Sequence, residues 1–179
     1  MLTPPLTQVA VRINVMGFIP VDGTFDRFDG WLDFDPARPG TCQIRLRIET
    51  ASLSTASETV REDAIGPGFL DSARFPVIAY DGGCEGDAIL GRLDMHGVTR
   101  PFALGLTFGP DPALAAGLPL RLALRPDLKP ERSGQLAVAT GSMRRSEWGM
   151  DGRHLLVGDT VRITVTTRVP LAETAVSKR

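Results

Sequence analysis

The sequence of 179 residues predicts an all-β fold, and three observations indicate it. Apolar and polar residues alternate in several segments, which is the period of a half-buried strand. Turn-forming residues are frequent, with 19 Gly and 14 Pro. A single segment has the pattern of a helix. Because about eight antiparallel strands close naturally into a barrel, we expect a barrel with a short helical insertion. A two-sheet sandwich is the alternative.

The first strand is expected where Val9, Val11, Ile13 and Val15 alternate with small or polar residues. The next segment, VDGTFDRFDGWLDFDP, mixes aromatic residues with acids and glycines. Two of its aromatic residues lie three positions apart, which breaks the period of two. We therefore expect one strand that is bent or bulged near Gly30.

The clearest strand pattern is TCQIRLRIET, which follows a turn expected at residues 35–40. Cys42, Ile44, Leu46 and Ile48 share one face of this strand, and its charged residues share the other. A slip of the pairing by one residue would bury three charges, so the register of the strand is strongly specified.

The helical segment is expected to begin at a cap on Ser57 and to run to about Ile65, where Gly66-Pro67-Gly68 ends it. Apolar residues follow in the next loop. They are expected to pack this insertion onto one end of the barrel: Phe69, Leu70 and Phe75.

The remaining strands are expected in the second half of the chain. One begins over residues 77–80, and a hairpin follows over 88–108, where GRLDMHGVTRPFALGLTF places a short turn between two alternating segments. Further strands are expected over 118–124 and 160–169, where apolar and other residues alternate, and over 136–143.

Length and composition indicate one domain over residues 1–179, with a core at about 9–169 and a frayed tail at 170–179. The net charge of −1 provides no strong field that would select nucleic acid. No stretch reaches the ~18 apolar residues of a membrane span. The N-terminus lacks the features of a secretory signal, so we expect a cytoplasmic protein without an integral membrane segment.

The two cysteines, Cys42 and Cys84, lie in unrelated contexts. They form no C-x-x-C motif and have no nearby histidine that would suggest a metal site. We expect two independent thiols, with a Cys42–Cys84 disulfide as the alternative, and we expect no bound metal.

Motifs of enzymes are absent from the sequence: it has no G-x-S-x-G elbow, P-loop, dinucleotide fingerprint or H-E-x-x-H motif. Its two histidines, His96 and His154, are expected in turns, without an orienting group beside them. We therefore expect neither enzymatic activity nor a cofactor. The apolar stripes fit a dry core and a cavity equally well.

Four segments, in this order, resemble the YceI-like family: VDGTFDRFDGWLDFDP, IETASLSTASETVREDAIGPGFLDSARFPVIAY, LGRLDMHGVTRPFALGLTF, and SMRRSEWGM with VGDTVRITV. These proteins are lipocalin-like barrels associated with the binding of polyisoprenoids and related amphiphiles. The resemblance implies an extended antiparallel barrel of about eight strands and a long tunnel for an isoprenoid chain. Met16 stands where family members commonly have a histidine, and residues 111–134 match less well.

The resemblance also implies that the apolar stripes line the tunnel. The residues expected there are Phe25, Phe28, Ile44, Leu46, Ile48, Leu93, Met95, Phe102, Leu104, Leu106, Trp148, Val161 and Ile163. A polar head group would lie near an opening, where Arg61, Arg144 or Arg145 could meet it. The alternative for Arg144 and Arg145 is an ordinary ion pair at the surface or at the end of a strand.

The leading functional hypothesis is a non-enzymatic carrier that sequesters a long-chain isoprenoid or a related amphiphilic lipid. One alternative is an enzyme that acts on a small apolar substrate in the same cavity, with His96 or an acid as the proton-transfer group. Another is a filled barrel that serves as a protein-interaction module. A homodimer is also left open.

Overall fold

The structure is a computed structural model that describes residues 1–34, 41–110, 135–153 and 155–169. The turn expected at 35–40, the strand expected over 118–124, His154 and the tail at 170–179 lie outside these residues.

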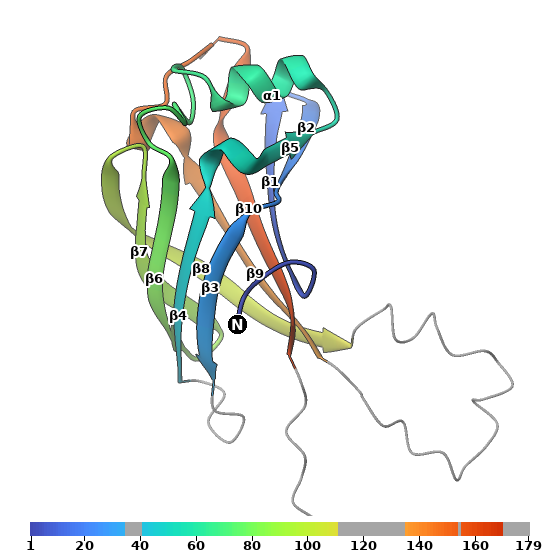
Figure 1. The fold of residues 1–179 in the computed structure, drawn as a ribbon, viewed down its shortest axis with the longest axis vertical. Coiled ribbons are helices and arrows are strands. Elements are labelled where there is room, and N and C mark those ends of the chain that lie inside the picture. Colours follow the sequence, from blue (N-terminus) through green and yellow to red (C-terminus); the bar gives the residue numbers. More distant parts are fainter. Residues whose placement is uncertain (35–40, 111–134, 154, 170–179) are drawn as a thin grey trace, which may run out of the picture.

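The described part of the chain forms one antiparallel sheet of ten strands, with one α-helix and two short 3₁₀ helices (Figure 1). The strands are β1 (Thr7–Val15), β2 (Ile19–Phe25), β3 (Phe28–Phe34), β4 (Cys42–Glu49), β5 (Leu53–Thr55), β6 (Val77–Glu85), β7 (Ala88–Met95), β8 (Val98–Pro110), β9 (Gln135–Arg144) and β10 (Val157–Val169). The helices are η1 (Thr50–Ser52), α1 (Glu58–Ile65) and η2 (Arg145–Trp148). The all-β prediction is confirmed.

The sheet curls into a barrel with the strand order β3-β4-β6-β7-β8-β9-β10-β1-β2-β5. β2 runs into β3 after two residues, and β4 runs into β5 through η1, so each pair is one long bent strand. Backbone bonds join the two bends: Asp26 N donates to Ser52 O (3.1 Å), and Glu49 N donates to Arg27 O (3.0 Å). Counted this way, eight strand positions surround the interior, as the sequence predicts.

The bend after β2 lies at residues 26–27, so its expected position near Gly30 is wrong. β3 pairs with β4 without a change of register, and Gly30 lies opposite Leu46. The break in the period of two occurs between Phe25 and Phe28. These two residues lie on the two sides of the bend, and both are buried. Glycine is required at position 30 for another reason, because a Cβ there would collide with the Arg45 carbonyl.

The helix begins and ends where the sequence predicts. Ser57 is the N-cap in extended conformation, although its side chain makes no capping hydrogen bond. Arg61 ties the helix to the end of the barrel, because its Nε donates to Leu53 O (2.9 Å) and its Nη2 donates to Ala51 O (3.1 Å). α1 therefore lies across one end of the barrel (Figure 1).

The expected β7–β8 hairpin is also confirmed. Met95 pairs with Val98, so the turn has two residues, His96 and Gly97. Both have positive φ angles, 53° and 74°. This geometry matches the right-handed twist of the two strands and favours glycine at the second position.

Cys42 and Cys84 form a disulfide, so the expectation of two independent thiols is wrong. Gln43 pairs with Gly83 in the β4–β6 ladder, which places the neighbouring cysteines opposite each other on the buried face. Their Cα atoms are 4.8 Å apart, a distance that a disulfide can bridge. A separation of 42 residues in sequence concealed this contact.

Candidate ligand-binding site

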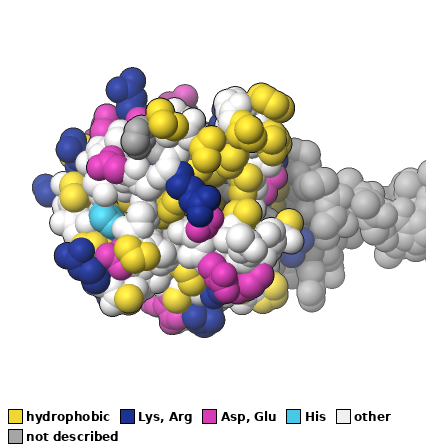
Figure 2. All heavy atoms as spheres, turned by 90° about the horizontal axis from the view of Figure 1, so that it is seen from above, with side chains coloured by type: hydrophobic (Ala, Val, Ile, Leu, Met, Phe, Trp, Pro, Cys, Tyr) yellow, Lys and Arg dark blue, Asp and Glu magenta, His cyan; other side chains and the backbone are white. Residues whose placement is uncertain are grey.

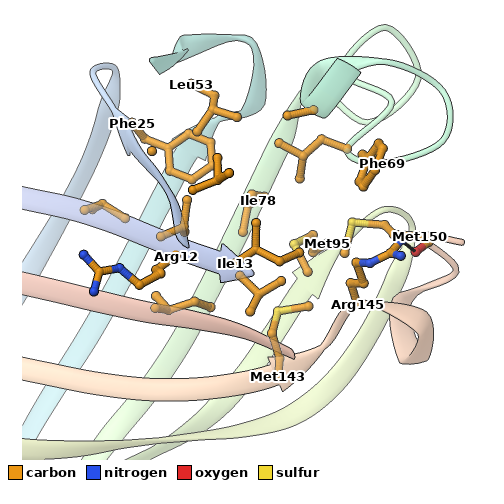
Figure 3. Close-up of a pocket in the computed structure, with 18 of the residues that line it drawn as sticks. Arg12, Ile13, Phe25, Leu53, Phe69, Ile78, Met95, Met143, Arg145 and Met150 are labelled. Carbon is orange, nitrogen blue, oxygen red and sulfur yellow. Dashed lines mark hydrogen bonds between the residues drawn. The ribbon is translucent and has the colours of Figure 1, made fainter. Parts of the chain in front are cut away.

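A cavity of about 370 Å³ lies inside the barrel at the end that α1 covers (Figure 3). Its volume is within the usual range for sites that hold a small molecule. The strands place their inward-facing residues around it, and α1 and the following loop contribute Val60, Ala64, Phe69 and Leu70. Phe69 and Leu70 thus pack at this end, as the sequence predicts.

The structure places most of the predicted tunnel residues in the wall of this cavity. These are Phe25, Leu46, Ile48, Leu93, Met95, Phe102, Leu104, Val161 and Ile163. Their contact with a ligand remains a prediction.

Four of the predicted residues do not line the cavity: Phe28, Ile44, Leu106 and Trp148. Ile44 is buried in the half of the barrel away from α1, where side chains pack directly on one another, and Phe28 is buried beside the bend, opposite Ile48. Trp148 is buried behind Phe102, with the two rings 6.5 Å apart and perpendicular. The cavity therefore occupies one part of the barrel and is shorter than the expected tunnel.

Tyr80 and Phe102 form the floor of the cavity. The Tyr80 ring lies over Gly82 and Gly91, where no side chain competes for the space. Its hydroxyl is 3.2 Å from the carbonyl oxygens of both Ile89 and Phe102. Burial raises the pKa of Tyr80 to about 12, so the floor carries no charge at neutral pH.

Sequence reasoning missed the contribution of β1, although it identified the alternation there. Val9, Val11, Ile13 and Val15 all line the cavity, because β1 lies between β10 and β2 and turns one face inward. Three methionines from separate elements also line it: Met95, Met143 and Met150 (Figure 3). Unbranched methionine side chains adapt to ligands of irregular shape. No local pattern marks Met143 and Met150 as neighbours.

Arg145 is the one predicted head-group residue that the structure places at the cavity. Its side chain is buried, with 3% of the residue exposed. Nε donates to Gly158 O (3.0 Å), Nη2 donates to Val157 O (3.0 Å), and Nη1 donates to Met150 O. The guanidinium also lies 5.2 Å from the Phe69 ring centroid. Within the described residues no carboxylate forms an ion pair with it.

Arg61 and Arg144 do not line the cavity, and their contact with a head group stays a prediction. Arg61 is held by backbone carbonyls and by Glu58, at 2.9 Å. Arg144 is the last residue of β9 and is exposed to solvent. Burial alternates from Met143 to Arg145, so Arg144 faces solvent and Arg145 faces inward.

Charged residues mark the opening of the cavity. Asp63 on α1 and Arg153 both line it, and they form an ion pair of 2.9 Å. The loop that carries Arg153 is also fixed by its backbone, since Gly152 N donates to Gly68 O at 2.7 Å. These contacts link two loops that are distant in sequence and leave the opening between α1, the β1–β2 hairpin and the segment before β10.

His96 does not line the cavity. Its Nδ1 lies 2.9 Å from Trp148 O, and its ring packs against Phe75 at 4.5 Å. No carboxylate of the described residues bonds to it, so the geometry gives no support to the proton-transfer role considered for His96. The described ranges also contain no group of three or more His, Cys, Asp or Glu side chains placed to hold a metal ion. No helix among the described residues is long and apolar enough to cross a membrane.

Comparison with known structures places the fold. BcnA of Burkholderia cenocepacia superposes with a TM-score of 0.70 at 16% identity, over 91% of this chain and 96% of that one. A polyisoprenoid binding domain from Saccharophagus degradans, implicated in plant cell wall breakdown, gives a TM-score of 0.55 at 12% identity, over 91% and 94% of the two chains.

Comparison of sequences identifies the family. A UPF0312 protein of Pseudomonas syringae pv. syringae is 32% identical over 113 residues, and one of Yersinia pestis is 29% identical over 101 residues. These matches span 58% and 54% of this chain, and 59% and 53% of the relatives, so little more than half of each relative is matched. The family model described as the YceI-like domain matches residues 2–169. The chain belongs to the YceI-like family.

Proposed function

We propose that this protein binds a long apolar chain, of a polyisoprenoid or a related amphiphilic lipid, and carries or sequesters it without changing it chemically. The observation that carries the proposal is the chemistry of the cavity wall. Apart from Thr55, Tyr80, Arg145 and the charged residues near its edge, the wall is aliphatic, aromatic, methionine or glycine. The Tyr80 hydroxyl and three Arg145 donors are already bonded to backbone.

A wall of this kind favours ligands in proportion to the apolar surface that they bury. Each buried methylene contributes about 0.8 kcal/mol, so ten carbons contribute roughly 8 kcal/mol before the costs of ordering. A short apolar molecule gains less than a long chain, because it buries fewer methylenes. A long chain that fills the cavity gains enough, which supports a lipid rather than a small apolar substrate.

The head group is proposed to lie on the Arg145 side of the cavity. A guanidinium has five N–H donors, of which three are bonded to carbonyls in Arg145. No carboxylate of the described residues forms an ion pair with it, and Asp159, which is bonded to Ser146, interacts with its charge from a greater distance. Arg153 lies near the opening and is paired with Asp63. An anionic or strongly polar head group would meet positive charge here and apolar surface elsewhere.

The likeness in fold to a polyisoprenoid binding domain supports the same ligand class. A filled barrel is not favoured, because the α1 end contains the cavity, although the far half is packed.

Matched substitutions on β10 test the proposal. Val161 lines the cavity, whereas its neighbour Thr160 is exposed on the outer face. Val161→Trp is expected to fill the cavity and to abolish binding of a fluorescent polyprenyl probe, and Thr160→Trp is expected to leave binding unchanged. Thermal unfolding of both variants shows whether each is folded. Equal binding by the two folded variants, or no binding of the probe by the unmodified protein, would overturn the proposal.

A further inference from the structure

Two neighbouring loops at the opening of the cavity expose large hydrophobic side chains. We name this group the apolar rim. It consists of Met16, Phe18, Ile19, Leu155 and Leu156. Phe18 is 78% exposed and Leu155 is 87% exposed, which is unusual for side chains of this size. Seen from the α1 end, hydrophobic side chains gather in one group beside a few charged ones (Figure 2).

The backbone holds the two loops together. Met16 N donates to Leu156 O at 2.6 Å, and Val15 pairs with Val157 in the β1–β10 ladder. The β1–β2 turn has positive φ at Met16 (53°) and Gly17 (82°). This tight turn presents Phe18 at its tip, so the rim is a fixed feature of the barrel end.

The rim is continuous with the cavity. Leu156 belongs to both, because it lines the cavity and is 51% exposed. Val15 and Val21, on the two sides of the hairpin tip, also line the cavity. Apolar surface therefore extends from the loop tips into the interior through Val15, Val21 and Leu156.

Two ion pairs lie beside the rim. Arg12 and Asp22, on the strands that lead to the hairpin tip, form an ion pair with distances of 2.5 and 2.9 Å. Asp63 is paired with Arg153. Neither loop itself, VMGFI at 15–19 or LLV at 155–157, contains a charged residue. Such a surface meets no strong repulsion from a zwitterionic or an anionic bilayer.

We infer that the apolar rim inserts into the surface of a phospholipid bilayer and places the opening of the cavity against the membrane. The inference rests on the proposed function, because it gives the lipid a path from the bilayer into the cavity that does not cross water. Two protruding tips suit shallow insertion.

Vesicle flotation tests this inference. The unmodified protein is expected to float with phosphatidylcholine vesicles, and equally well when phosphatidylglycerol is added. Phe18→Ser and Leu155→Ser are each expected to lower the partition coefficient at least about ten-fold, because each removes a large apolar side chain from the bilayer. Leu90→Ser is the matched control, since Leu90 is 45% exposed on β7 opposite Gly83, beside the disulfide and away from the rim. It is expected to leave flotation unchanged.

A second readout follows insertion directly. The variant Phe18→Trp is expected to show a blue-shifted fluorescence maximum when vesicles are added, against an unchanged spectrum for the unmodified protein. Absence of flotation by the unmodified protein would overturn the inference, as would an equal loss in the Leu90→Ser control. Flotation that requires phosphatidylglycerol would assign the contact to charge instead. Conversion of a dimer to a monomer by Phe18→Ser would assign the rim to a contact between two copies.

Probe binding, measured beside flotation, separates this inference from the proposed function. Rim variants that no longer float are expected to retain the probe-binding affinity of the unmodified protein, because the cavity is intact. If the unmodified protein floats with vesicles but does not bind the probe, the proposed function is contradicted and the rim stands as a membrane contact.

Discussion

Reduction of the Cys42–Cys84 disulfide is expected to lower the free energy of unfolding by up to about 4 kcal/mol. The bond joins residues 42 positions apart. The loss of loop entropy that a crosslink of this length imposes on the unfolded chain corresponds to about 4 kcal/mol at 25 °C. For a domain of this size, each kcal/mol changes the melting temperature by about 2–4 °C, so we expect a decrease of roughly 8–16 °C.

Urea unfolding with and without dithiothreitol measures this effect. The double variant Cys42→Ala/Cys84→Ala is the control, because it lacks the crosslink and its unfolding midpoint should not respond to the reductant. The midpoint of the reduced protein is expected to approach that of the variant. The reasoning is refuted if the reductant leaves the midpoint of the unmodified protein unchanged. It is also refuted if alkylation of the air-oxidised protein labels two thiols.

Three further predictions follow from other sites. Arg145→Met is expected to lower the free energy of unfolding by roughly 3 kcal/mol or more, because three backbone carbonyls lose a charged donor; an unchanged urea midpoint would contradict it. Tyr80 is the one tyrosine of the chain, so tyrosinate absorbance should titrate near pH 12 in the native protein and near ~10 in urea. Because the unfolded state loses this proton first, stability should fall from pH ~10 to 12, and Tyr80→Phe should lack that fall; a native midpoint near 10 would argue against burial. The disulfide predicts that rapid alkylation of intact cells, followed by mass spectrometry, leaves Cys42 and Cys84 unlabelled; labelling of both would show that the bond is absent in the cell.

Local patterns in the sequence predicted the strands and the helix well, for a physical reason. In β4, strict alternation from Cys42 to Ile48 leaves only one register that buries the apolar face, and the structure has that register. The helix is marked by a capping residue at one end and Gly66-Pro67-Gly68 at the other. Such signals act within a few residues, so a single sequence carries them.

Features that depend on distant residues were not predictable in this way. The disulfide follows from the register between β4 and β6, which are joined through η1, β5 and α1. The long strand β2–β3 bends at residues 26–27 because the neighbouring long strand, β4–β5, bends beside it at η1. Neither partner is adjacent in sequence.

The extent of the cavity could also not be predicted from the sequence. Ile44 and Leu46 continue the same alternation on β4, yet Leu46 lines the cavity and Ile44 packs in the far half. The boundary between them is set by Tyr80, which crosses the interior over Gly82 and Gly91. Likewise, Arg144 and Arg145 are adjacent residues of one type, yet only Arg145 is buried, where three backbone carbonyls later in the chain accept its donors.

Native mass spectrometry of the freshly purified protein, combined with solvent extraction, tests the central claim most directly. The claim predicts a bound species that is released on unfolding, extracts into organic solvent, and has the mass of a long-chain isoprenoid or related amphiphile. It also predicts that Val161→Trp purifies without this species while Thr160→Trp retains it. Repeated recovery of the unmodified protein without any lipid, together with failure to take up added polyprenyl compounds, would contradict the claim.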